Sequence, residues 1–116
     1  MQTLENAQLV RVIVGESDRQ GGAALYEAIV LKARELGLAG ATVTRACMGY
    51  GASSRMHTTK LLRLSIELPM VIEIVDQPAK IMMLMPFLDE TVHGGLVTIQ
   101  DLRVVHYRGA QTPPNA

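Results

Sequence analysis

The chain of 116 residues has little of what several classes of site and scaffold require. Its single cysteine, Cys47, excludes an internal disulfide and any cysteine-rich zinc cluster within one chain. Eleven basic residues balance eleven acidic ones, so no overall positive field exists to hold nucleic acid or an anionic membrane surface. No uncharged apolar run is long enough to cross a bilayer, and no basic segment followed by an apolar core opens the chain. These absences predict one soluble, cytoplasmic domain that does not bind nucleic acid.

What the chain does contain is an ordered series of strand and helix patterns. Residues 9–14 (LVRVIV) are apolar at every position but Arg11, which predicts a strand covered on both faces and therefore central in its sheet. The other expected elements are a helix over residues 25–36, a strand over 41–48, a strand over 62–75 bent at Pro69, a helix over 78–92 kinked at Pro86, and a strand over 96–107. We expect residues 1–7 to be a loose lead-in, residues 8–108 to form the domain and residues 109–116 to be a flexible tail.

Hydrophobic periodicity supports the two helices and the third strand. Apolar residues recur at spacings of four, four and three in the first helical segment and of three, one, three and four in the second, and every second residue is apolar from residue 62 to residue 74. The helical stripes are Leu25, Ile29, Ala33 and Leu36 in the first helix, and Ile81, Leu84, Met85, Leu88 and Val92 in the second. Each helix therefore has one face that can cover a sheet.

Polar residues at the element ends predict local features. Ser17 or Asp18 is expected to cap the first helix, and Asp76 the second, because short oxygen-bearing side chains accept hydrogen bonds from free helical N–H groups. The alternation of the last strand changes phase at Gln100 and Asp101, which predicts a bulge there.

The element order is strand, helix, strand, strand, helix, strand. This order matches an α+β ferredoxin-like βαββαβ fold, in which two helices cover one face of a four-stranded antiparallel sheet. The first strand is apolar on both faces, and Val71 and Val75 lie opposite the apolar parity of the third strand. Something must therefore cover the second face, and self-association into a closed ring, with a site between subunits, is the simplest cover.

Residues 40–60 (GATVTRACMGYGASSRMHTTK) concentrate the polar chemistry of the chain. A strand pattern ends at Gly49 and Gly51, and Ser53, Arg55 and His57 follow within one short loop. Backbone N–H groups and a guanidinium in such a loop can hold an anion. The alternative interpretation is a solvated connection with ordinary turn chemistry.

Three segments of the chain resemble a known family. They are GESDRQGGAALYEAIVLKARELGLAGATVTRACMGYG, HTTKLLRLSIELPMVIEIVDQPAKI and LDETVHGGLVTIQDLRVVHY, and the resemblance as a whole extends over roughly residues 10–107. The chain is identified by them as a member of the uncharacterised bacterial family called domain of unknown function 190, which is similar to the PII signalling proteins. LPMVIEIVD followed by a helix also resembles the third strand and second helix of PII proteins.

This resemblance implies a homotrimer with a long loop after the second strand and adenine nucleotides bound between subunits. Carried over by motif, the base of that loop is Gly49, Gly51, Ser53 and His57, and the loop before the last strand contains Gly94 and Gly95. Arg45, Arg55 and Arg108 are candidate phosphate partners because guanidinium groups bind phosphate. The chain departs from PII proteins in lacking their lysine-containing phosphate loop and a modifiable loop tyrosine. It departs from its closer family at Ala24 and Ala46, where proline and glycine are usual.

Three functions are compatible with the sequence. The first is a PII-like regulator that binds a small anionic effector such as AMP, ADP or ATP, needs no cofactor, and controls a partner through the loop; PII analogy suggests a membrane transporter or channel. The second is a metal-binding trimer using His57, His93 and His106, although no two histidines have the spacing of a preformed site. The third is an enzyme, which we do not expect, since the clusters at residues 16–19 and 89–90 contain no nucleophile with an adjacent base.

Overall fold

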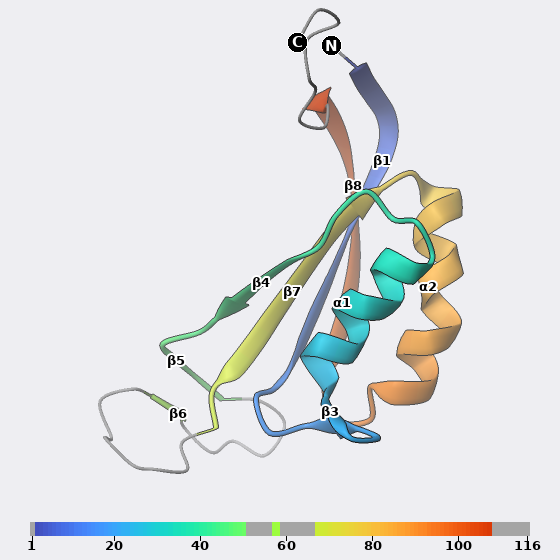
Figure 1. Cartoon of the computed structure of the whole chain (residues 1–116). Helices are drawn as coiled ribbons and strands as arrows, with labels where there is room; N and C mark the ends of the chain where they lie inside the picture. The colour runs from blue at the N-terminus through green and yellow to red at the C-terminus, as the bar shows by residue number, and fades with distance from the viewer. Residues whose placement is uncertain (1, 51–56, 59–66, 108–116) are drawn as a thin grey trace, which may run out of the picture.

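The computed structural model describes residues 2–50, 57–58 and 67–107, which form a four-stranded antiparallel sheet with two helices on one face (Figure 1). The strand order is β4-β7-β1-β8, made of β4 (Thr42–Arg45), β7 (Pro69–Asp76), β1 (Gln2–Gly15) and β8 (Leu96–Tyr107). The helices are α1 (Leu25–Glu35) and α2 (Pro78–Thr91). Two short hairpins pair β2 (Arg19–Gln20) with β3 (Ala23–Ala24), and β5 (Met48–Gly49) with β6 (His57–Thr58). The predicted α+β ferredoxin-like fold class is confirmed.

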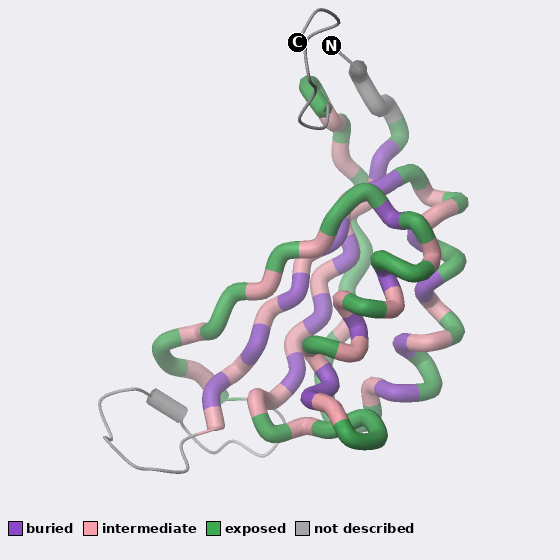
Figure 2. Tube along the Cα trace, in the orientation of Figure 1, coloured by how far each residue is buried: buried purple, intermediate pink, exposed green. Residues whose placement is uncertain are grey.

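The hydrophobic core lies between the helices and one face of the sheet (Figure 2). Side chains of β7 alternate between half-buried and buried along its length, because period two places every second residue against the helices. Val10, Val12 and Val14 of β1 pack into the same core, and β1 lies between β7 and β8 as the sequence predicts. From the helices the core receives Leu25, Ile29, Ala33, Ile81, Leu84 and Leu88. Neither helix of the described chain is both long and apolar enough to cross a membrane.

The sheet surface opposite the helices, here called the open face, carries a mixed set of half-buried side chains. In the two central strands these are Leu9, Arg11 and Ile13 of β1, and Val71, Glu73 and Val75 of β7. Arg11 and Glu73 are direct cross-strand partners and form an ion pair with an N···O distance of 2.7 Å. In its two central strands the open face is therefore apolar around one paired charge, which fits the predicted burial by another copy of the chain.

The N-terminal segment and the irregularity of the last strand differ from the sequence predictions. Residues 2–7, expected as a loose lead-in, belong to β1, where Gln2 pairs with Tyr107. Pairing is continuous through Gln100 and Asp101, so the bulge predicted there is wrong. The register shifts between the pairs Leu4↔Val104 and Ala7↔Leu102, where Asn6 has a φ of 59°, and again between the pairs Gln2↔Tyr107 and Leu4↔Val104. Asparagine tolerates this left-handed conformation, and at the shift beside it β1 holds one extra residue; at the second shift the extra residue is in β8.

Neither aspartate predicted as a helix cap acts as one. The N-cap residues are Ala24 for α1 and Gln77 for α2, without side-chain cap hydrogen bonds. Asp18 accepts a hydrogen bond from the Gly15 N–H through its carboxylate, and its main-chain carbonyl accepts from the Leu25 N–H. The carboxylate of Asp76 instead accepts hydrogen bonds from the N–H groups of Ala39 and Gln77. Pro78 does open α2, and Pro86 lies inside it, as predicted.

The central part of the chain is only partly described. β4 ends at Arg45, earlier than the strand predicted over residues 41–48, and the paired segment resumes at Met48 in β5. β7 begins at Pro69, where a residue without an N–H is tolerated because it is the first of the strand. The predicted hairpin arm at residues 61–66 and the predicted tail at 109–116 lie outside the described residues.

Candidate functional site

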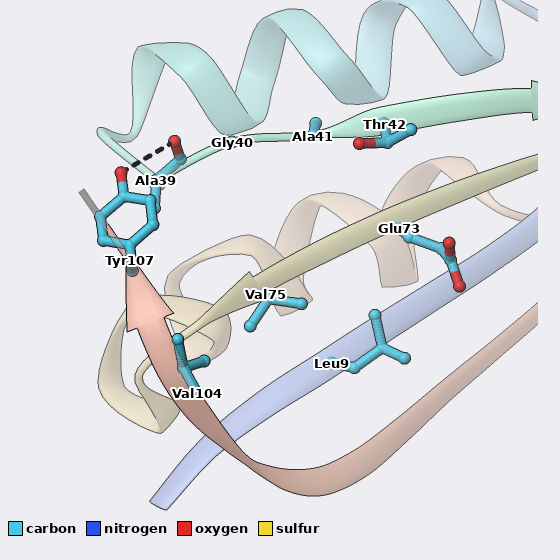
Figure 3. A pocket seen from close by; sticks show the side chains of 9 residues that line it. All are labelled: Leu9, Ala39, Gly40, Ala41, Thr42, Glu73, Val75, Val104 and Tyr107. Carbon is cyan, nitrogen blue, oxygen red and sulfur yellow. Dashed lines mark hydrogen bonds between the residues drawn. The ribbon is translucent and has the colours of Figure 1, made fainter. Parts of the chain in front are cut away.

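A cavity of about 620 Å³ opens on the open face, where the end of β8 meets the segment before β4 (Figure 3). We call it the β4–β8 cavity. Its lining comes from β1, β7, β8 and the segment entering β4: Leu9, Ala39, Gly40, Ala41, Thr42, Glu73, Val75, Val104 and Tyr107. The volume lies in the range of pockets that bind small molecules and cofactors.

The cavity exists because the end of β8 bends across the sheet. β8 and β4 are separated by two strands, so in a flat sheet they would lie about 14 Å apart, or three strand spacings. Instead, the Tyr107 hydroxyl donates a hydrogen bond to the carbonyl of Ala39 at 3.4 Å. Figure 3 shows β8 curving past the end of β7 toward Ala39. The register shift near Asn6 lies just before this bend, where a bulge increases the local twist.

The cavity is lined mainly by apolar side chains, with a few polar groups. Leu9, Val75 and Val104 supply apolar surface, while Thr42 and Tyr107 supply hydroxyls. Such a lining, mostly apolar with a few placed donors and acceptors, is typical of sites for small organic ligands.

Glu73 is the charged residue of the described lining, and Arg11 fixes its position. Arg11 donates from both Nε and Nη2 to Oε2 of Glu73, at 2.9 and 2.7 Å. Both bonds use the same oxygen, so Arg11 leaves Oε1 of Glu73 able to accept a hydrogen bond from a ligand. A carboxylate held by a guanidinium keeps its orientation without help from the ligand.

Asp76 anchors the segment before β4, which forms one wall of the β4–β8 cavity. Its side chain is buried, with Oδ2 accepting a hydrogen bond from the Ala39 N–H at 2.9 Å and Oδ1 accepting from the Gln77 N–H at 2.7 Å. One carboxylate therefore links the segment before β4 to the start of α2. The Ala39 carbonyl, which meets Tyr107, belongs to the residue that Asp76 anchors.

We expect Asp76→Ala to lower the free energy of unfolding by about 2 kcal/mol, because two backbone donors lose their acceptor in a buried place. Urea denaturation measures the change. Asp89→Ala is the matched control, since Asp89 is exposed on α2 and its removal should change stability by less than about 0.5 kcal/mol. Equal effects of the two substitutions would contradict the anchoring role of Asp76.

Arg45, a predicted phosphate partner, lies away from the β4–β8 cavity. Its Nε is 3.0 Å from Oε2 of Glu16, and its Nη2 donates to Oε1 of Glu16 at 3.1 Å. The register places Arg45 opposite Met70, on the helix side of the sheet, whereas the cavity is on the open face. A phosphate would have to compete with Glu16 for the Nε and Nη2 edge of this guanidinium.

The predicted glycines lie at two other places. Gly49 pairs with His57 across β5 and β6, so the two ends of the long loop meet. Gly94 and Gly95 connect α2 to β8, and Gly95 lines a second cavity, of about 520 Å³, between these elements. Arg45, Gly49, Gly94 and Gly95 thus do not line the β4–β8 cavity. Gly51, Ser53, Arg55 and Arg108 lie outside the described residues, as does the side chain of His57.

The metal hypothesis finds no cluster to support it in the described part of the chain. Among those residues, no three His, Cys, Asp or Glu side chains are grouped so that they could hold a metal ion. Glu16 is paired with Arg45, and Asp18 accepts from the Gly15 N–H. Asp89 and Glu90 are exposed at the end of α2.

The sequence does not predict the lining of the β4–β8 cavity. In the sequence Glu73 is a polar position in an alternating strand, and Tyr107 is the last residue of the last expected strand. One pattern could have identified Glu73: Arg11 and Glu73 are opposite charges inside otherwise apolar segments, and such charges need a partner when they are half-buried. No comparable pattern points to Tyr107, because its contact with Ala39 depends on the bend of β8.

Comparisons with known proteins agree with this fold. The family model DUF190, described as "Uncharacterized ACR, COG1993", matches residues 7–104. A UPF0166 protein of Aquifex aeolicus is 38% identical over 101 residues, covering 85% of this chain and 93% of that protein. A UPF0166 protein of Methanocaldococcus jannaschii is 33% identical over 104 residues, covering 89% of this chain and 94% of that protein.

Solved structures of PII-like proteins have the same fold at low sequence identity. A putative PII-like signalling protein from Thermus thermophilus matches with a TM-score of 0.62 and 17% identity, covering 90% of this chain and 94% of that one. CPII, a nitrogen regulatory PII-like protein from Thiomonas intermedia, bound to ADP, AMP and bicarbonate, matches with a TM-score of 0.64 and 16% identity. That match covers 90% of this chain and 92% of CPII. At these identities the structures establish a common fold.

Proposed function

Because the chain belongs to the DUF190 family and has the fold of PII-like signalling proteins, we propose that it is a homotrimeric regulator that binds an adenine nucleotide. The nucleotide binds in the β4–β8 cavity, at a subunit interface. The observation that carries the proposal is this cavity, with its apolar walls, its few polar groups and its anchored carboxylate. The structure of CPII bound to ADP and AMP suggests the nucleotide class.

The lining suits the nucleoside part of the ligand. A purine base has two apolar faces, which Leu9, Val75 and Val104 can contact, and an edge of donors and acceptors. Backbone groups of residues 40–41 and the hydroxyl of Thr42 can pair with that edge. Oε1 of Glu73 can accept a hydrogen bond from a base amino group or a ribose hydroxyl, since Arg11 binds only Oε2.

The phosphates extend out of the cavity toward another subunit. Among the described residues, the lining includes no basic side chain, and the carboxylate of Glu73 repels phosphate. The basic side chains that bind the phosphates must therefore come from outside this lining. Arg55 and Arg108 are the proposed phosphate partners within the chain, and a neighbouring copy packed on the open face supplies basic side chains of its own. The ring predicted from the apolar open face thus completes the nucleotide site.

The proposed output is regulation of a partner, without catalysis. Gly49 and His57 pair at the ends of the loop that follows β4, and β4 begins with the cavity residue Thr42. A nucleotide that binds two loop arrangements with different affinity shifts the balance between them. The partner that recognises the arrangement of this loop is, by PII analogy, a membrane transporter or channel.

Nucleotide binding is tested by calorimetry and thermal unfolding of the purified chain with AMP, ADP, ATP, GMP and ribose 5-phosphate. We expect at least one adenine nucleotide to bind without turnover. At one hundred times its Kd it should stabilise the folded chain by about 2.7 kcal/mol, which raises Tm by several degrees. Light scattering of the same samples should give three times the chain mass.

The possible results separate the parts of the proposal. Binding of ribose 5-phosphate as tight as that of AMP would contradict recognition of a base. No binding of any adenine nucleotide would overturn the proposed ligand, and a monomer mass with binding intact would overturn the trimer. Conversion of ATP to ADP at catalytic rates would overturn the non-enzymatic role.

A further inference from the structure

We propose that Tyr107 is a ligand-contacting residue whose ring stacks on the base and so restricts the β4–β8 cavity to planar aromatic ligands. The inference rests on the proposed function, because it concerns the ligand of the same cavity. It adds a selecting residue that comes from the far edge strand of the sheet and not from the loop or the glycines.

The position of Tyr107 is not explained by packing of the core. Tyr26 and Phe87 are partly buried aromatic residues that pack against the core cluster, and Tyr107 is not among the side chains that do so. Tyr107 is 38% exposed, and its ring lines the cavity. A half-exposed aromatic side chain at the edge of an apolar cavity has its face available for a ligand.

The hydroxyl of Tyr107 keeps the ring at the cavity wall. It donates to the Ala39 carbonyl (Figure 3). Ala39 is anchored in turn by Asp76. The 3.4 Å separation makes this a weak bond, which can break when a ligand enters or leaves. The cavity of about 620 Å³ is present in the structure in which Tyr107 bonds Ala39. The hydrogen bond therefore positions the wall and does not close the cavity.

Stacking on an aromatic ring discriminates by ligand shape. Contact between a base and an aromatic side chain contributes on the order of a tenfold or larger gain in affinity, for any base with a π-face. Ligands without a planar ring, such as ribose 5-phosphate or a small organic acid, gain nothing from it. Within the described lining of this cavity, Tyr107 is the one aromatic side chain, so the discrimination depends on it.

The test compares AMP binding to Tyr107→Phe and Tyr107→Leu in the full chain. Tyr107→Phe keeps the ring, so its affinity for AMP should stay within about threefold of the natural chain, with faster dissociation. Tyr107→Leu removes the ring, so its affinity should fall about tenfold or more. Tyr50→Leu is the matched control, because Tyr50 is 64% exposed and does not line the cavity.

A spectroscopic readout separates stacking from a structural role. The chain has three tyrosines and no tryptophan, so tyrosine emission can be followed directly. AMP should quench this emission in the natural chain and in Tyr50→Leu, and the quenching should disappear in Tyr107→Phe, which still binds AMP. Wild-type affinity of Tyr107→Leu, or quenching that persists in Tyr107→Phe, would overturn the inference and leave the proposed function in place. Failure of the natural chain to bind AMP, ADP or ATP would overturn both.

Discussion

Thr42→Trp should reduce nucleotide affinity by about a hundredfold or more while the chain stays folded. Thr42 is exposed at the start of β4, lies on the open face opposite Glu73 and lines the β4–β8 cavity. An indole at this position occupies space that the base needs, so the ligand meets a steric clash. Tryptophan is well tolerated in strands, and within one chain an exposed position on an edge strand imposes no packing cost. Calorimetry with AMP or ADP measures the loss.

Thr44→Trp provides the control for this substitution. Thr44 lies two residues further along β4, on the same face and also exposed, but it is not part of the cavity lining. This variant should bind nucleotide as the natural chain does. If both variants lose binding, the ligand site is not the β4–β8 cavity, or an indole anywhere on this face disrupts it. The mass of each variant by light scattering separates these two explanations.

The sequence predicts the layers of this fold because each layer follows from a local period. Alternation along residues 70–75 identifies which side chains of β7 are buried, and the stripe through Leu25, Ile29 and Ala33 identifies the buried face of α1. A local pattern cannot predict where two distant segments meet. Tyr107 and Ala39 are 68 residues apart in the chain, and their contact depends on the bend that follows the bulge in β1.

The aspartates show why local chemistry can mislead. Asp76 precedes a proline and a helical pattern, which is the usual context of an N-cap. In the structure Gln77 takes that place, because the carboxylate of Asp76 is buried and accepts a hydrogen bond from the N–H of Ala39. A capping prediction considers the donors of the following helix only. The competing donor comes from a segment 37 residues earlier, which the folded sheet brings close.

Gly95→Ala should lower the free energy of unfolding by about 2–3 kcal/mol, although the family resemblance assigns Gly95 to a ligand loop. A Cβ at this position would lie 2.5 Å from the main-chain oxygen of Ile13, and 3.0 Å from side-chain carbons of Val14 and Val92. The close oxygen belongs to the central strand β1, so it cannot move aside without disturbing the sheet. Urea denaturation measures the effect directly.

Gly94→Ala separates this steric requirement from a role in binding. A Cβ at Gly94 would meet no atom within 4 Å, so the substitution should change stability by less than about 0.5 kcal/mol. If the two variants are equally stable, β1 does not require the glycine at position 95. If Gly94→Ala keeps its stability but loses affinity for AMP, the backbone before β8 contacts the ligand, and the site extends from the β4–β8 cavity to this loop in an adjacent copy. Unchanged affinity in Gly94→Ala, together with the instability of Gly95→Ala, would mean that close packing against β1 is the reason for a glycine here.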